Sequence, residues 1–439
     1  TQVPAPPKAA GALFFLAGRS ASSSVVAVLF AFQGRRARGP RGKAEDRPRT
    51  RLTTFAALAD PGFRNLEINR STDNQHKRAA RELTMSAPPV PPFQTPVIEV
   101  LDATLREGSY AVNFQMDEKF VASLLCRLDD TPIQKIEIGH GIGYEAERAG
   151  FTPSNISLDR WCEIARSNLT SSSWGMFAQP EFSRLSTLSD LCDQGMSFVR
   201  IGMEASQVPD NLDYIEQAVE ICDQVYLNLM KSSATPAAEI PKLLSKVTPE
   251  IAGLYIVDSY GSMLPGDVKE YINVVKDLCP VIGFHGHDNL GMANANSMAA
   301  LETGAAIVDG TLDGIGRGAG NAETESLAGI ISMLGEDKYS YQALARIAGF
   351  CRANLEPLPE NRNLQVLGGV IGVHSGYFPF IEKICAEYGL EPATLMEKAA
   401  ELARCSVHRN DIREAADRMV AALEAEMKSL DASVAGGAR

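Results

Sequence analysis

The feature that most restricts the fold is a regular alternation of short β-rich runs with longer stretches of helical periodicity. The predicted strands, in chain order, are residues 97–104, 133–138, 173–177, 198–202, 224–229, 251–257, 281–285 and 306–311. Eight strand–helix units are the number that a closed (β/α)₈ barrel, the TIM barrel, requires. An open, doubly wound α/β sheet would alternate in the same way, so the count favours the barrel without excluding the open sheet.

The barrel segment has an extension on each side. Helices predicted within the barrel segment include residues 118–128, 211–222, 265–278 and 294–302. Residues 340–430 show no further strand pattern, so we expect a helical C-terminal region with an amphipathic stretch at residues 411–430. We expect residues 1–95 to be a disordered extension ending in a Pro-rich linker. The predicted domains are therefore residues 1–95, 96–335 and 336–439.

The composition of the N-terminal extension resembles a targeting segment. Residues 1–43 contain seven basic residues and no acidic one, and they are rich in Ala, Gly and Ser. This composition is typical of an organelle transit peptide. Met85, which a Pro-rich stretch follows, is an alternative start, in which case residues 1–84 are not part of the protein. We expect a plastid or mitochondrial location if residues 1–84 are expressed, and a cytoplasmic one otherwise.

Charge and cysteine content exclude several classes of function. Residues 85–439 carry 27 basic and 48 acidic side chains, so we expect no nucleic-acid partner. Small acids can still bind, because the charge near a site matters more than the total. No run of about 20 apolar residues occurs, and no membrane association is expected. The eight cysteines form no CxxC motif and are predicted to be reduced, buried side chains rather than disulfides.

Three polar clusters follow predicted strands at the end where TIM barrels carry their functional residues. They are residues 102–108 at the end of the first strand, 285–289 at the end of the seventh, and 314–321 just after the eighth. Because these three strands become neighbours when a barrel closes, side chains about 200 residues apart should meet.

The pair His285 and His287 predicts a metal site. The two residues alternate on a strand, so both side chains point to one face. With Glu107 as the carboxylate, they would leave open positions on a divalent metal that could polarise a 2-keto acid and hold its enolate. Asp102 is a weaker ligand candidate because it is nearer the strand body, and Asn321 is an additional oxygen donor. The alternative is that both histidines are ordinary surface or core side chains.

Two basic residues are candidates for the chemistry. Arg106 is a permanent cation that could stabilise a developing oxyanion, although it could instead form a structural salt bridge with a barrel carboxylate. Lys231 indicates a rival chemistry, a Schiff base with a ketone substrate, although an exposed loop lysine is far commoner. The loop at residues 314–320 resembles a phosphate cradle only weakly, and we interpret it as a tight βα loop beside the site.

Three motifs taken together resemble the signature of the DRE-TIM metallolyases. They are Leu-Arg-Glu-Gly at 105–108, His-Gly-His-Asp-Asn at 285–289 and Gly-Ala-Gly-Asn at 318–321. That superfamily includes 3-hydroxy-3-methylglutaryl-CoA lyase, the isopropylmalate and homocitrate synthases, and 4-hydroxy-2-oxovalerate aldolase. Residues 136–143, 257–259, 295–297 and 372–378 are similar to the last of these in particular. The resemblance implies a Mn²⁺ or Mg²⁺ cofactor bound by Glu107, His285 and His287, transition-state stabilisation by Arg106, and substrate contact at Arg106, Ser259 and His285.

The sequence departs from the aldolase pattern at three positions. Glu107 stands where the aldolases usually have Asp. Tyr110 stands in the place of their catalytic histidine, and His374 in the place of a tyrosine that lines the same pocket. We hypothesise that His374 is the general base and Tyr110 its hydrogen-bonding partner, because a histidine titrates near neutrality. The alternative is that both side chains only pack.

The expected function is metal-dependent retro-aldol cleavage of a 4-hydroxy-2-oxo acid, through a metal-bound enolate, to pyruvate and an aldehyde. The resemblance also implies a homo-oligomer and an aldehyde dehydrogenase partner that contacts the C-terminal region. One alternative is an acyl-CoA-dependent Claisen synthase or lyase. The loop at 314–320 lacks the cysteine that the hydroxymethylglutaryl-CoA lyases carry there. The other alternative is a non-catalytic barrel subunit, against which the intact set of candidate residues argues.

Overall fold

The computed structural model describes residues 98–358, 361–403 and 406–436. The predicted N-terminal extension, with its targeting composition and Pro-rich linker, lies outside these residues. Within the part of the chain that is described, no helix is both long and apolar enough to span a membrane.

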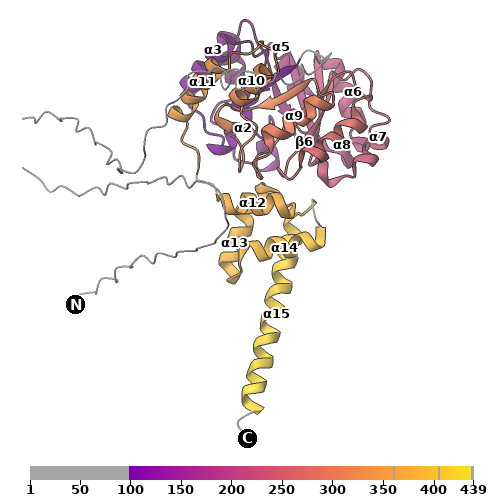
Figure 1. The fold of residues 1–439 in the computed structure, drawn as a ribbon, viewed down its shortest axis with the longest axis vertical. Coiled ribbons are helices and arrows are strands. Elements are labelled where there is room, and N and C mark those ends of the chain that lie inside the picture. Colours follow the sequence, from indigo (N-terminus) through magenta and orange to yellow (C-terminus); the bar gives the residue numbers. More distant parts are fainter. Residues whose placement is uncertain (1–97, 359–360, 404–405, 437–439) are drawn as a thin grey trace, which may run out of the picture. The chain divides into compact units, whose positions relative to one another are not determined.

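Eight parallel strands form a closed barrel in the order in which they occur in the chain (Figure 1). They are β1 Glu99–Asp102, β2 Lys135–Glu137, β3 Ser173–Ala178, β4 Phe198–Glu204, β5 Gln224–Met230, β6 Gly253–Asp258, β7 Ile282–Gly286 and β8 Ile307–Gly310. The barrel closes where β1 pairs with β8, with Glu99 opposite Ile307. The predicted TIM barrel is therefore confirmed, and the open doubly wound sheet is excluded.

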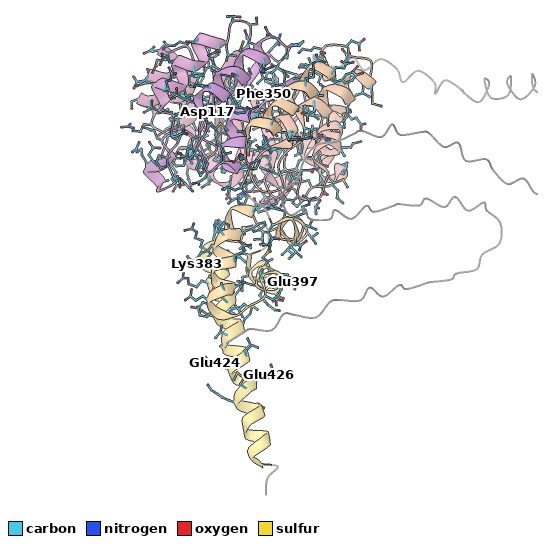
Figure 2. The ribbon with its side chains drawn as sticks, turned by 90° about the vertical axis from the view of Figure 1, so that its left-hand side faces the viewer. Asp117, Phe350, Lys383, Glu397, Glu424 and Glu426 are labelled. Atoms are coloured by element: carbon cyan, nitrogen blue, oxygen red, sulfur yellow. The ribbon has the colours of Figure 1, made fainter. Side chains whose placement is uncertain are left out.

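Helices follow the strands and cover the barrel (Figure 1). They are α2 Thr104–Ala111, α3 Glu118–Asp129, α4 Leu158–Asn168, α5 Leu185–Asp193, α6 Leu212–Ile221, α7 Ile240–Leu243, α8 Pro265–Val275, α9 Ala293–Thr303, α10 Thr324–Met333 and α11 Tyr341–Asn354. Local sequence fixes where several of them begin. Asp117, which Figure 2 labels, caps α3, for example, and accepts a 2.9 Å hydrogen bond from the backbone N–H of Phe120.

The predicted helical C-terminal region is confirmed. It contains α12 Arg362–Ile371, α13 Phe378–Tyr388, α14 Pro392–Ala403 and α15 Arg409–Gly436. These helices bury an apolar cluster of their own, which includes Ile381, Leu395 and Ile412. Helix α11 belongs to the barrel's core instead, and its Phe350 stacks on Phe120 of α3 at 5.6 Å between ring centroids (Figure 2). The domain boundary near residue 335 stays a proposal.

The inside of the barrel is layered. Phe198, Tyr226 and Tyr255 form an aromatic layer, with edge-to-face contacts at 6.2 and 5.8 Å between ring centroids. Arg200 lies two residues after Phe198 on β4, so its side chain is on the same side of the strand. Its guanidinium carbon lies 4.3 Å from the centroid of the Tyr255 ring. A layer of charged side chains therefore follows the aromatic layer, and it supports the site described below.

Asp102 has a structural role at the end of β1. It is fully buried and accepts hydrogen bonds from the backbone N–H of Thr104 at 3.0 Å and the hydroxyl of Thr324 at 2.7 Å. These bonds join β1 to the first turn of α10. Burial raises the pKa of this carboxyl to about 6, although both hydrogen bonds act in the opposite direction. Asp102 is not among the three residues that could share a metal ion.

We expect Asp102 to make stability depend on pH. Between about pH 4 and pH 6 the folded chain retains a proton that the unfolded chain releases, so the free energy of unfolding should fall as the pH rises through this interval. Asp102→Asn cannot titrate and should show a smaller fall. Urea unfolding of both proteins at several pH values across the interval measures this difference. Equal pH slopes in the two proteins would contradict the assignment.

Candidate metal centre and active site

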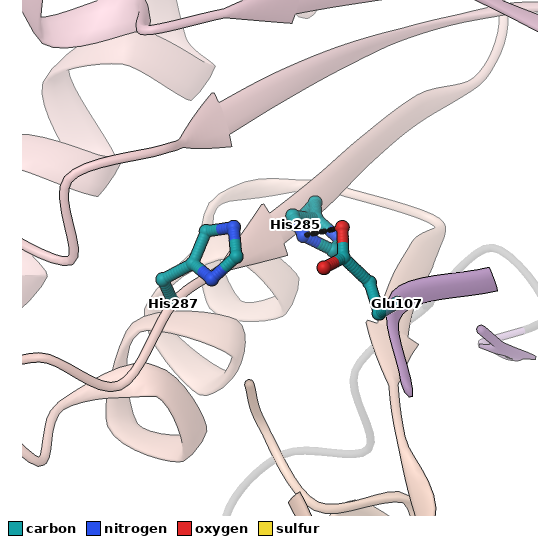
Figure 3. Close-up of side chains that lie close together, drawn as sticks. All are labelled: Glu107, His285 and His287. Carbon is teal, nitrogen blue, oxygen red and sulfur yellow. Dashed lines mark ion pairs between the residues drawn. The ribbon is translucent and has the colours of Figure 1, made fainter. Parts of the chain in front are cut away.

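Glu107, His285 and His287 converge at the C-terminal end of the barrel (Figure 3). Glu107 lies in the first turn of α2, His285 is the last residue but one of β7, and His287 directly follows that strand. One potential ligand atom from each residue lies within 4.8 Å of those of the other two, and all three side chains are buried. The predicted meeting of side chains far apart in the sequence is therefore observed.

Hydrogen bonds orient both histidines toward the centre of this group. Nδ1 of His285 lies 2.8 Å from Oδ2 of Asp309, and Nδ1 of His287 lies 3.3 Å from the carbonyl oxygen of Gly320. The carboxylate and the carbonyl can only accept, so each imidazole donates from Nδ1, which leaves Nε2 as the ring nitrogen available to a metal. Nε2 of His285 lies 3.5 Å from Oε1 of Glu107. This arrangement is the one that metal-binding histidines use.

The polar atoms around this group fit a divalent cation. Oε2 of Glu107 and both amide atoms of Asn321 are buried without a hydrogen-bond partner among the described residues. Buried polar atoms without a partner are costly, and a bound cation would satisfy such oxygens. Burial raises the pKa of Glu107, but Arg106 and His285 outweigh it and hold this pKa below its ordinary value. The group therefore offers a carboxylate and two imidazoles as potential metal ligands.

Arg106 lies directly beside this group. Its Nε donates to Oε2 of Glu137 at 2.7 Å, and its Nη1 donates to Oε1 of Glu107. The guanidinium carbon lies 4.9 Å from the centroid of the Phe177 ring. The salt bridge that we considered as an alternative is therefore present, and it also fixes the guanidinium next to the candidate metal ligands.

A buried network of charges beneath the site was missed from the sequence. Arg200 donates to Oε2 of Glu137 at 3.0 Å and to Oδ2 of Asp309. Glu137 also holds Arg106, and Asp309 also holds His285, so the network ties the candidate catalytic arginine to a candidate metal ligand. The sequence did contain a signal for this network, because these charged residues interrupt strands that are otherwise apolar.

Removing the charge of Asp309 should weaken metal binding. Asp309→Asn loses the carboxylate that orients His285, and changes of this kind typically lower metal affinity roughly 10–100-fold. Calorimetric titration with Mn²⁺ measures the effect. Asp129→Asn, which changes a carboxylate at the C-terminal end of α3, is the matched control and should bind like the wild type. Unchanged affinity in Asp309→Asn would argue against the metal centre.

A cavity of about 710 Å³ opens over the site. The residues that we predicted to act on the substrate all line it: Arg106, Tyr110, Ser259, His285 and His374. They come from α2, from the loop after β6, from β7 and from the segment before α13. The structure therefore brings the predicted residues into one pocket, including the one from the C-terminal region.

Arg317 is a pocket residue to which we assigned no role from the sequence. Its Nη1 contacts both ring nitrogens of His374, at 3.0 Å for Nδ1, and its Nη2 lies 3.0 Å from Nε2 of His287. Nη2 also donates to the carbonyl oxygen of Ser259 at 3.1 Å, and the guanidinium carbon lies 5.8 Å from the centroid of the Tyr110 ring. Arg317 lies inside a loop that we quoted for its glycines, and its charge was the available signal.

Tyr110 and His374 therefore each lie next to Arg317. Burial, followed by the Glu107 carboxylate, raises the pKa of Tyr110 to about 12, so it keeps its proton. Burial and the neighbouring Arg317 hold the pKa of His374 well below its ordinary value, so this imidazole is neutral but does not titrate near neutrality, as the hypothesis of a general base had assumed. The backbone N–H of Gly376 also donates to Nδ1 of His374, at 3.2 Å. The hydrogen bond between Tyr110 and His374 stays a prediction.

Lys231 and Ser259 form the wall beside β5 and β6. The hydroxyl of Ser259 accepts a 2.8 Å hydrogen bond from the backbone N–H of Lys231, whose φ of 51° lies in the left-handed region. Nζ of Lys231 forms an ion pair with Glu204 at 2.6 Å, and only 16% of the lysine side chain is exposed. Lys231 is therefore a pocket residue with a fixed partner rather than an exposed loop lysine.

The glycine-rich loop after β8 is the tight loop that we expected. Gly314, Gly318 and Gly320 all have positive φ, between 62° and 87°. A Cβ on Gly316 would lie 2.0 Å from Nδ2 of Asn321. Glycine at these positions lets the loop fold back and bring Asn321 against the site.

Comparison with known proteins identifies the family. The family described as HMGL-like matches residues 193–350. The 4-hydroxy-2-oxovalerate aldolase of Spirochaeta aurantia is 32% identical over 309 residues, which cover 68% of this chain and 89% of the relative. The enzyme of the same name from Burkholderia pseudomallei (strain K96243) is 29% identical, over 74% of this chain and 94% of the relative.

A solved structure supports the fold. The carboxyl transferase domain of Rhizobium etli pyruvate carboxylase superposes with a TM-score of 0.61, at 14% identity, over 76% of this chain and 61% of that chain. Together with the aldolase relatives and the buried Glu–His–His group, these findings establish that the chain belongs to the HMGL-like (DRE-TIM) family and is related to the 4-hydroxy-2-oxovalerate aldolases.

Proposed function

We propose that this protein cleaves a 4-hydroxy-2-oxo acid to pyruvate and an aldehyde by a retro-aldol reaction that requires Mn²⁺ or Mg²⁺. The observation that carries the proposal is the convergence of Glu107, His285 and His287 beside the guanidinium of Arg106. The relatives at about 30% identity, which are named as aldolases for such a substrate, support it.

Each residue of the site then has a chemical task. A divalent metal held by Glu107, His285 and His287 would supply Lewis-acid chemistry to the 2-keto acid. Arg106 donates N–H groups to the oxygen that becomes negative as pyruvate enolate forms. Because Glu107 and Glu137 already hold this guanidinium, it needs little reorganisation during the reaction.

His374 is the proposed general base. As a neutral imidazole it can take the proton of the 4-hydroxyl group, whose oxygen then forms the aldehyde carbonyl. The C3–C4 bond breaks, its electron pair moves into the enolate of pyruvate, and a proton returns to C3. Tyr110 would hydrogen-bond to His374, and Ser259 would contact the substrate.

The proposal is tested by measuring pyruvate release from a series of 4-hydroxy-2-oxo acids. We expect release in the presence of Mn²⁺, loss of release with EDTA, and no effect of borohydride. Inactivation by borohydride would indicate a Schiff base on Lys231 instead. Thiol release from acetyl-CoA with pyruvate would favour a Claisen enzyme, and absence of stoichiometric metal would favour a non-catalytic subunit.

The proposal extends to the assembly. The proposed cleavage releases a reactive aldehyde, so we also propose an aldehyde dehydrogenase partner. We propose in addition that the protein is a homo-oligomer. Exposed apolar side chains on α12 and α15, such as Val370 and Met427, are consistent with a protein contact at the C-terminal region. Light scattering of the protein alone, and then with an aldehyde dehydrogenase, measures both expectations.

A further inference from the structure

The pocket is lined mainly by positively charged side chains, although the chain as a whole is negatively charged. Four arginine and lysine side chains line the pocket, and Glu107 supplies the one carboxylate among the lining residues. The four are Arg106, Lys231, Arg317 and Arg409. The chain as a whole has a net charge of −12. A cationic pocket in an acidic protein concentrates anionic ligands at that place.

Two of these cations are already neutralised by carboxylates. Arg106 is held by Glu107 and Glu137, and Lys231 is held by Glu204. Arg317 differs from them. In the described part of the chain, no carboxylate lies within ion-pair distance of it, and its hydrogen-bond partners are two imidazoles and the carbonyl oxygen of Ser259. A half-buried guanidinium with only neutral acceptors is poised for an anion.

Metal binding would free Arg317 further. Its Nη2 donates to Nε2 of His287, the atom whose lone pair a metal ion would take. A divalent cation and a guanidinium cannot share that lone pair, and they repel each other. In the metal-loaded protein, the N–H groups of Arg317 would therefore need another acceptor inside the pocket.

The position of Arg317 indicates which part of the substrate it meets. Its other contact, His374, is the proposed base for the 4-hydroxyl group. Arg317 therefore lies between the metal ligand His287 and the proposed base, next to the aldehyde half of the substrate, whereas Arg106 lies beside Glu107, next to the pyruvate half. The cavity of about 710 Å³ lies in the upper part of the range of about 300–1,000 Å³ that small-molecule sites span, so it has room for a longer acid.

We propose that the substrate carries a second anionic group on its aldehyde half, and that Arg317 binds this group as a specificity-determining residue. The inference rests on the proposed function and deepens it, because the aldehyde product would itself be an acid. A carboxylate or phosphate at this place would draw the guanidinium away from His374 and leave that imidazole able to accept the hydroxyl proton. A neutral aldehyde half would not.

Binding of acids that cannot be cleaved tests the anion site independently of the proposed retro-aldol activity. With Mn²⁺ present, 2-oxoglutarate and 2-oxopentanoate are a matched pair, because only the first carries a second carboxylate. Calorimetry should give roughly 10–100-fold tighter binding of 2-oxoglutarate, the range of a charge-assisted hydrogen bond. Arg317→Met should remove this preference, and Arg317→Lys should keep part of it. Lys398→Met removes an exposed positive charge on α14 and should leave the preference unchanged.

Turnover gives the second readout. We expect kcat/KM to be higher for 4-hydroxy-2-oxoglutarate than for 4-hydroxy-2-oxopentanoate, and Arg317→Met to reverse or abolish this order. Equal binding of the two oxo acids by the wild-type protein overturns the inference, even if both hydroxy acids are cleaved. If 2-oxoglutarate is preferred and Arg317→Met removes the preference but neither hydroxy acid is cleaved, the anion site stands and the retro-aldol proposal fails.

Discussion

Replacing Glu107 with alanine is expected to lower metal-dependent pyruvate release by about 10³-fold or more and to abolish stoichiometric binding of Mn²⁺. Glu107 is the only carboxylate in the group that could hold the metal, and imidazole ligands carry no negative charge to offset that of a divalent cation. Loss of the Lewis acid removes several kcal/mol of transition-state stabilisation, and each 1.4 kcal/mol corresponds to about a tenfold change in rate. Metal analysis and a pyruvate assay measure the two effects.

Two control variants make the Glu107 result interpretable. Glu107→Asp keeps the carboxylate on a shorter side chain and should retain part of the metal affinity. Glu302→Ala removes an exposed carboxylate that pairs with Lys269 between α9 and α8, and it should behave like the wild type. If Glu107→Ala bound Mn²⁺ with wild-type affinity, the Glu–His–His group would not be the metal centre.

Replacing Arg106 with methionine is expected to lower kcat by about 10²–10³-fold while metal binding persists. This is the range observed when a preorganised donor to a developing oxyanion is removed. Nη1 and Nε of Arg106 are held by Glu107 and Glu137, so the guanidinium is fixed next to the candidate ligands before substrate arrives. Methionine keeps much of the side-chain volume against Phe177, which limits the structural effect.

A purely structural role for Arg106 would give a different pattern. Glu137 retains Arg200 as a partner in the variant, so the fold should survive, and circular dichroism and thermal unfolding would monitor this. Arg106→Lys keeps the charge but not the paired donor geometry, and its kcat should lie between those of the wild type and Arg106→Met. Wild-type kcat in Arg106→Met would exclude Arg106 from the chemistry, and loss of kcat only in proportion to loss of folded protein would assign it to stability.

The barrel could be predicted from local patterns. Every predicted strand is present, and helices such as α3 and α8 begin where the sequence places them, because Asp117 and Pro265 are strong signals for a helix N-terminus. The meeting of Glu107 with His285 and His287 followed from one topological rule. In a closed parallel barrel, the ends of strands 1, 7 and 8 are adjacent, so residues placed at those ends converge.

The long-range side-chain contacts around the site could not be predicted from the sequence. Arg317 and His374 are separated by 57 residues, and they meet only because the loop after β8 and the segment before α13 both reach the mouth of the barrel. The network of Arg200, Glu137 and Asp309 likewise joins three strands. Periodicity and strand ends are local properties, so the order of the residues encodes them. Which long side chain reaches which partner depends on the distances that appear only after the barrel has closed.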